Sequence, residues 1–130
     1  MNITKYNAKD CVVTIDGVYI TGMGEDMVTG EKDEDNASAV VGAQGDVVVN
    51  ETNNTLGTIK VTVQGTSPQL AYLKKLARTK AIFPIWVTNK ALGEKFGGTK
   101  AMFKKPAAIE YGAELADREL EIQVFDYTEE

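Results

Sequence analysis

Apolar and polar side chains alternate strictly along one stretch near the middle of the chain. The apolar positions are Ile59, Val61 and Val63, and the polar positions between them are Lys60, Thr62 and Gln64. A period of two is typical of a strand that buries one face and wets the other. We therefore expect a strand here, ending at Gly65.

The period changes to that of a helix directly after this strand. Leu70, Tyr72, Leu73, Leu76 and Ala77 fall on one side of a helical wheel, and Lys74, Lys75, Arg78 and Thr79 fall on the other. We expect a helix over residues 68–79, with Ser67 as its N-cap and Pro68 in the first helical position. It is the only helix that the sequence indicates, and its apolar stripe needs a sheet to pack on.

The stretch before this strand predicts two hairpins. Asp16-Gly17 separates two β-rich runs and is a strong hairpin signal. A longer hairpin is expected over residues 27–50, with Asn36, Ala37 and Ser38 at its tip. Its return strand is expected to be interrupted at Gly42 to Gly45. Gly30 lies in mid-strand and indicates a thin or bulged strand face.

The second half of the chain predicts further strands. Residues 82–87 are apolar on both faces, and Pro84 places that strand at an edge or a bulge. A Lys/Gly-rich loop over 88–99, a strand over 99–111 and a last strand over 120–125 follow. Residues 1–10 form an N-terminal arm, and residues 126–130 form an acidic tail. The fold class is mainly β: a β-sandwich or half-barrel of seven or eight strands with a single flanking helix, in one domain spanning 1–130.

The composition argues against most catalytic chemistry. The chain has no His and one Cys, Cys11. It therefore has no Ser–His or Cys–His pair and no His-ligated metal, and a single Cys cannot build a zinc site. No phosphate-binding glycine loop is present. We expect no enzymatic activity, no cofactor and no metal.

Charge is distributed in blocks along the chain. Residues 25–51 hold eight acidic residues and one Lys, residues 52–105 hold ten basic residues and one Glu, and residues 106–130 hold eight acidic residues and one Arg. The formal net charge of -5 argues against binding of nucleic acid through phosphates. Blocks of opposite sign suit a subunit that assembles with copies of itself, and they equally suit solvated surfaces. No apolar run is long enough for a membrane anchor, and no export signal is evident.

Several segments, taken in their order, resemble a known family. They are Tyr19-Ile-Thr-Gly-Met-Gly-Glu-Asp-Met27, Glu31-Lys-Asp-Glu-Asp35, Val41-Gly-Ala-Gln-Gly-Asp-Val47, Glu51-Thr-Asn-Asn54, Leu56-Gly-Thr58 and Thr66-Ser-Pro-Gln69. The likeness covers roughly residues 6 to 127 and is to the tail tube proteins of contractile-tailed bacteriophages. It lies in the order and spacing of the segments, because no single motif is diagnostic.

The resemblance implies a structural role in the virion. Tail tube subunits are β-sandwiches with one helix that form hexameric rings, which stack into a tube with an acidic lumen through which DNA leaves. The implied partners are copies of the chain, the tail sheath protein, the baseplate or initiator proteins and the tape measure protein. Assembly is expected in the host cytoplasm.

The resemblance also suggests which residues carry this role. Candidates for lining the lumen are Glu31, Asp33, Glu34, Asp35, Asp46 and Glu51, of which strand alternation allows about half to face inward. Candidates for contacts between rings or subunits are Asn36, Ala37, Ser38, Pro84, Trp86, Lys100, Lys104 and Lys105. A solvated acidic hairpin and a lysine-coated exterior remain open for both sets.

Two other functions stay open at this level. The first is the tube of a phage-tail-like bacteriocin or a secretion machine, for which the subunit physics is the same. The second is a monomeric β-sandwich that binds a ligand such as a carbohydrate, which would present a concave aromatic platform.

Overall fold

The computed structural model describes residues 1–130 as ten strands, one α-helix and one short 3-10 helix. The strands are β1 (Cys11–Ile15), β2 (Val18–Tyr19), β3 (Met23–Lys32), β4 (Ala37–Val41), β5 (Val47–Glu51), β6 (Gly57–Val63), β7 (Phe83–Asn89), β8 (Glu94–Phe103), β9 (Arg118–Val124) and β10 (Thr128–Glu129). The helix α1 spans Leu70–Thr79, and the 3-10 helix η1 spans Ala8–Asp10. The predicted fold class, mainly β with one helix, is confirmed.

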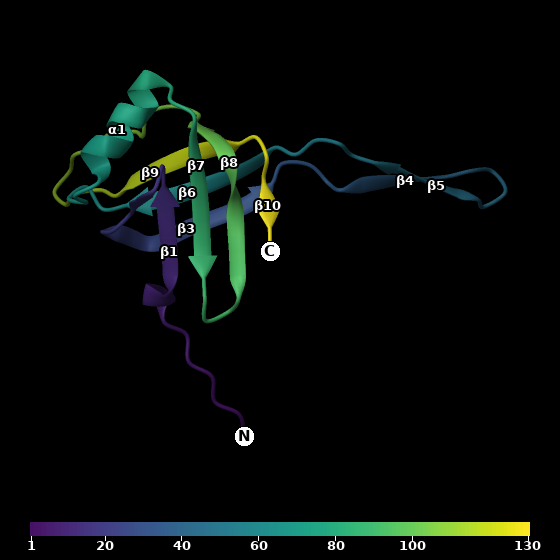
Figure 1. The fold of residues 1–130 in the computed structure, drawn as a ribbon, viewed down its shortest axis with the longest axis horizontal. Coiled ribbons are helices and arrows are strands. Elements are labelled where there is room, and N and C mark those ends of the chain that lie inside the picture. The colour runs from purple at the N-terminus through teal and green to yellow at the C-terminus, as the bar shows by residue number, and fades with distance from the viewer.

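Eight strands form one antiparallel sheet that folds into two layers. Its order is β2-β1-β7-β8-β9-β6-β3, and β10 pairs with β8. In Figure 1, β1, β7 and β8 lie along one axis as antiparallel neighbours, and β3, β6 and β9 lie across them. The long strand β8 joins the layers, because it pairs with β7 along most of its length but with β9 only from Ala101 to Phe103.

The core lies between the layers and consists of every second side chain of the central strands. Along β6, Ile59, Val61 and Val63 are fully buried, as the alternation predicts. The matching residues of the neighbouring strands complete the core: Val13, Ile15, Phe83, Ile85, Val87, Ala101, Phe103, Leu120, Ile122 and Val124. The intervening positions of each strand therefore form an outer face.

The helix closes one end of the sandwich (Figure 1), burying Leu70, Leu73, Leu76 and Ala77. The predicted Ser67 cap is wrong. Gln69 occupies the N-cap position without a side-chain bond, and Ser67 Oγ donates to the Thr21 carbonyl at 2.7 Å. Ser67 thus ties the helix approach to the chain after β2. The helix has ten residues and is too short to cross a membrane.

The predicted Asp16-Gly17 hairpin is confirmed. Ile15 pairs with Val18, and Asp16 and Gly17 have φ values of 53° and 77°. These positive angles match a type I′ turn, whose twist suits two antiparallel strands. Asp16 also accepts a 2.6 Å hydrogen bond from the Tyr72 hydroxyl, which links the turn to α1.

Of the predictions for the second half of the chain, the one for Pro84 is confirmed in its bulge alternative, and others are wrong in position. The strand containing Pro84 is not at an edge, because β7 lies between β1 and β8; its register shifts between Phe83 and Ile85, as the bulge alternative expected. The 88–99 loop is shorter, since β7 and β8 are separated only by residues 90–93, and β8 ends at Phe103. Part of the predicted acidic tail forms β10, whose backbone pairs with β8 at Phe96 and Gly97.

Gly97 is required where β8 pairs with β7 opposite Trp86. Its φ is +143°, and a Cβ there would collide with the Ile85 carbonyl. We expect Gly97→Ala to lower the free energy of unfolding by about 3 kcal/mol or more, because strain and overlap add. Gly93→Ala is the control. Gly93 has φ +70° with nothing near its missing Cβ, so we expect a loss of about 1 kcal/mol. Urea unfolding measures both, and equal losses would contradict the packing role of Gly97.

Candidate functional site

A two-stranded arm projects from the body of the molecule (Figure 1). It consists of β4 and β5, which pair only with each other, from Ala37↔Glu51 at the base to Val41↔Val47 near the end. This corrects the expected 27–50 hairpin and its tip at Asn36, Ala37 and Ser38. The strand β3 pairs with β6, and the turn of the arm is Gly42 to Asp46, where Gly42 N–H donates to the Asp46 carbonyl at 2.7 Å. The predicted interruption at Gly42 to Gly45 is therefore the tip of the arm.

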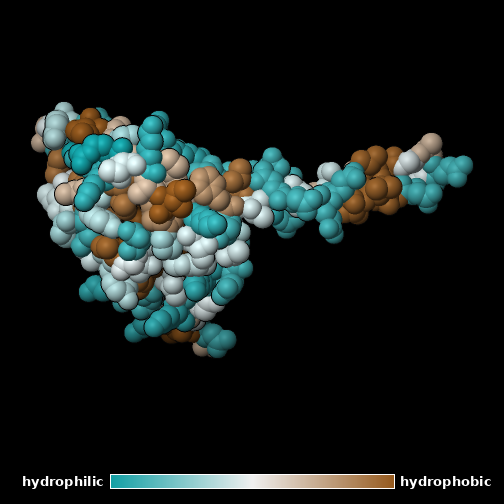
Figure 2. Space-filling view, turned by 45° about the horizontal axis from the view of Figure 1, so that its top comes forward, coloured by the Kyte–Doolittle hydropathy of each residue, from teal (hydrophilic) through white to brown (hydrophobic).

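The outer half of the arm is apolar on both faces. Directly paired residues share a face, so Val41, Val47 and Val49 lie on one side, and Val40 and Val48 lie on the other. These five valines are 57% to 65% exposed. Figure 2 shows them as a continuous hydrophobic segment between a polar tip and a polar base. A lone two-stranded ribbon has no second layer against which to bury such side chains.

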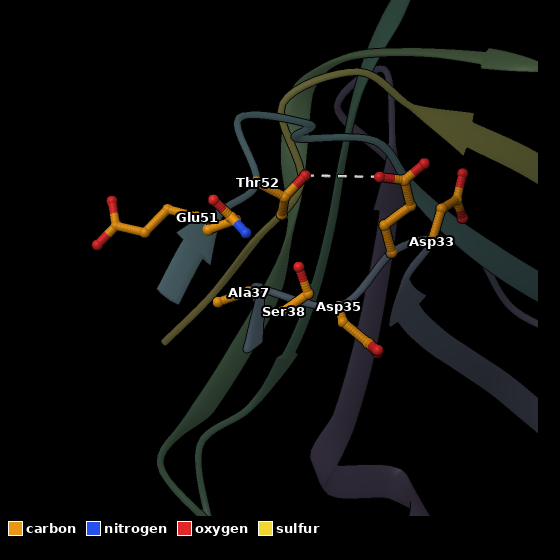
Figure 3. Close-up of a pocket in the computed structure, with 8 residues that line it drawn as sticks. Asp33, Asp35, Ala37, Ser38, Glu51 and Thr52 are labelled. Carbon is orange, nitrogen blue, oxygen red and sulfur yellow. Dashed lines mark hydrogen bonds between the residues drawn. The ribbon is translucent and has the colours of Figure 1, made fainter. Parts of the chain in front are cut away.

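The base of the arm carries an acidic hollow (Figure 3). Its lining residues are Asp33, Glu34, Asp35, Ala37, Ser38, Asn50, Glu51 and Thr52. Thr52 Oγ1 donates to Glu34 Oε2 at 3.5 Å, and Lys32 Nζ donates to Asn36 Oδ1 at 3.1 Å. The hollow is open, and no cluster of His, Cys, Asp or Glu in the structure is arranged to hold a metal ion.

Asp33 ties this base to the sheet. Its two carboxylate oxygens accept hydrogen bonds from Thr58 Oγ1 at 2.7 Å and Gln123 Nε2 at 3.0 Å. Gln123 Nε2 also donates to the Gly57 carbonyl at 2.8 Å. The Thr58 and Gln123 hydrogen bonds lower the pKa of Asp33, because they favour its charged form. These bonds connect the base of the arm to β6 and β9.

The outer face of β3, β6, β9 and the end of β8 forms a second surface, which we call the polar face. Register places its side chains in rows across the strands. It consists of Thr29, Glu31, Asp33, Thr58, Lys60, Thr62, Met102, Lys104, Glu119, Glu121 and Gln123. Four of these side chains are acidic and two are lysines.

A tyrosine from the C-terminus fills the junction of arm and sheet. Tyr127 is buried, and a Cβ at Gly57 would collide with it. A Cβ at Gly30 would collide with Phe96, so the glycine that indicated a thin strand face is needed where that ring packs. The Tyr127 hydroxyl donates to Glu129 Oε1 at 2.6 Å, and its N–H donates to the Thr55 carbonyl at 3.0 Å.

The six lumen candidates are divided among three places. Glu31 and Asp33 belong to the polar face, Glu34, Asp35 and Glu51 lie at the base of the arm, and Asp46 lies at the tip. The prediction omitted Glu119 and Glu121, although they alternate with Leu120 and Ile122 in the last strand. That alternation indicates that Glu119 and Glu121 lie on the outer face of their strand, but it does not indicate which strands are the neighbours of β9.

The contact candidates are also dispersed. Asn36, Ala37 and Ser38 begin the arm. Pro84 and Trp86 lie on the outer face of β7, where Lys95 Nζ is 4.4 Å from the Trp86 ring centroid. Lys100 is exposed on β8, and Lys104 and Lys105 follow that strand. Lys104 forms the one salt bridge of the structure, with Glu121 Oε1 at 3.6 Å.

Two solved structures share this fold. One is the cryo-EM structure of an extracellular contractile injection system, the PVC sheath/tube terminator in the extended state. It matches at a TM-score of 0.67 and 10% identity over 98% of each chain. The other is the anti-feeding prophage cap (AFP tube terminating cap), with a TM-score of 0.63, 11% identity and coverage of 100% of this chain and 95% of that chain. At these identities the likeness shows the fold alone.

The family is shown by sequence. The profile of the bacteriophage PhiTE tail tube protein family matches residues 7–114, most of the chain. The chain therefore belongs to this phage tail tube family, a family of structural proteins. No curated protein matches it closely enough to count as a relative.

Asp33 offers a test of how the base of the arm is held. We expect Thr58→Val to raise the pKa of Asp33 toward its ordinary value, because the variant removes one of the two donors to the carboxylate. Since the folded-state pKa of Asp33 is lowered, its stabilising contribution is present above the unfolded pKa and is lost as pH falls through the folded value. NMR titration of the carboxyl carbons measures the shift, with Thr66→Val as an exposed control. An unchanged Asp33 pKa in Thr58→Val would contradict the assigned bond.

Proposed function

We propose that the chain is the structural subunit of a phage tail tube and assembles into hexameric rings that stack into a tube conducting DNA. Membership of the tail tube family supports this role. The single observation that carries self-assembly is the arm, whose five half-exposed valines have no cover within the chain.

The arm is proposed to bury its valines against a neighbouring copy in the tube. Fully burying an exposed valine contributes roughly 1.5 kcal/mol, so the uncovered part of each contributes about half of that. Five such side chains repeated around a ring supply a substantial driving force. Because the arm extends well beyond the body, its outer half is the part available to a neighbour.

Open strand edges support joining of copies side by side. The strand β3 ends the sheet, and its far edge has no partner, while the opposite end is the two-residue strand β2. Unpaired edges invite pairing with another chain, and a closed barrel removes them. The proposed ring therefore satisfies backbone groups that a single copy leaves to water.

The polar face is proposed to line the bore. Its excess of carboxylates repels phosphates, so DNA would pass without being held. The lumen proposal thus keeps Glu31 and Asp33 and adds Glu119 and Glu121. The proposed partners are the tail sheath, the baseplate or initiator and the tape measure protein, with assembly in the host cytoplasm.

Light scattering and negative-stain microscopy of purified protein at rising concentration test this function. We expect the wild type to form six-fold rings or hollow tubes. We expect Val48→Asp to remain a 14.1 kDa monomer with nearly unchanged thermal stability, because Val48 is exposed and the new charge opposes burial. Gln44→Asp adds the same charge in the turn, without removing apolar area, and should still assemble.

Two results would contradict the proposal. A wild-type chain that stays monomeric with its initiator proteins added would rule out tube formation. Assembly of Val48→Asp as readily as Gln44→Asp would show that the arm valines are not buried in the assembly.

A further inference from the structure

Two lysines on the polar face are placed on either side of one carboxylate. Lys60 of β6 and Glu121 of β9 are direct register partners. On the other side of Glu121, the N–H of Lys104 donates to the Glu121 carbonyl at 3.0 Å, which continues the β8–β9 register. The three residues form one row across adjacent strands, and their side chains share a face.

Within this row, Lys104 and Glu121 form an ion pair. Lys104 Nζ is 3.6 Å from Glu121 Oε1 and donates to Thr58 Oγ1 at 3.3 Å. Thr58 in turn donates to Asp33. Direct cross-strand partners have Cβ atoms about 5 Å apart, which places the Lys60 ammonium within reach of the same carboxylate. Glu121 therefore lies between Lys60 and Lys104 and forms its ion pair with Lys104.

We propose that Glu121 keeps Lys60 and Lys104 from binding nucleic acid, and so makes this face non-adhesive to a passing polyanion. The inference rests on the proposed function, in which the polar face lines the bore. The net negative charge of the polar face does not by itself prevent DNA binding, because phosphate binding depends on individual lysines that are free to make contact.

Repetition around a ring would strengthen DNA binding by lysines that Glu121 no longer neutralises, and so would slow the passage of DNA. Each contact between a lysine and a phosphate contributes a slope of about −0.9 to the dependence of log affinity on log salt. Two new contacts therefore change affinity by about tenfold between about 50 and 200 mM salt. In a ring the same pair recurs in every copy, and linked weak contacts add through high effective concentration.

The test compares two isosteric changes on the same strand and the same face. Glu121→Gln uncovers both lysines. Glu119→Gln removes an equal charge from a residue whose register partner is Thr62 and serves as the matched control. Fluorescence anisotropy with a short labelled DNA duplex measures binding to each protein, in parallel with microscopy of the same samples.

We expect Glu121→Gln to bind DNA about tenfold more tightly than the wild type at about 50 mM salt and to lose that gain at about 200 mM. Glu119→Gln should stay close to the wild type. The triple change Lys60→Gln, Lys104→Gln and Glu121→Gln should abolish the gain. Equal DNA binding by Glu121→Gln and Glu119→Gln, or a gain that survives in the triple variant, would overturn the inference.

Microscopy separates this inference from the proposed function. Tubes that form without any gain for Glu121→Gln would overturn the role of Glu121 and leave the tube intact. A gain measured on monomers that never assemble would support neutralisation by Glu121 and contradict the tube. If Glu121→Gln forms tubes that bind DNA and the polar face lines the bore, we also expect the bound DNA to be protected from nuclease.

Discussion

The alternation along β6 and β9 is the constraint on which the rest of the structure depends. Every second residue of these strands lies in the core, and the residues between them form the polar face. Stability and surface chemistry are therefore fixed by one register. A slip of one residue would bring Lys60 and Glu121 into the core and Ile59 and Ile122 into water. The same apolar packing that holds the sandwich together also keeps the charged row in line.

The arm differs from the body, because its strands do not have one buried and one exposed face. Its ten strand residues alternate in direction like any others, but there is no second layer beneath either face, so pairing alone cannot bury Val40 or Val48. The body anchors it at only one end, through the bond from Gln123 to Asp33 and the bond from the Tyr127 N–H to the Thr55 carbonyl. A firm base and an unsatisfied outer half are the properties expected of an element whose remaining contacts come from another chain.

The sequence predicted the elements whose signals are local. Alternation at 59–64, the helical period at 70–77 and Asp16-Gly17 each depend on near neighbours, and each matches the structure. The partners of strands were not predictable in this way. Residues 27–50 contain two turns, and their pattern does not indicate that β3 pairs with β6. The predicted tip was therefore at Asn36 to Ser38. The row joins Lys60 to Glu121, 61 positions later, and Glu121 to Lys104, 17 positions earlier, and only the fold reveals it.

The position of Tyr127 ties the base of the arm to the sandwich. Its ring packs where Gly57 leaves room, and its N–H donates to the Thr55 carbonyl, so the support of the arm comes from a segment far along the sequence from β4 and β5. A change that loosens the pairing of β10 with β8 would therefore also loosen the base of an arm that is distant from it in sequence.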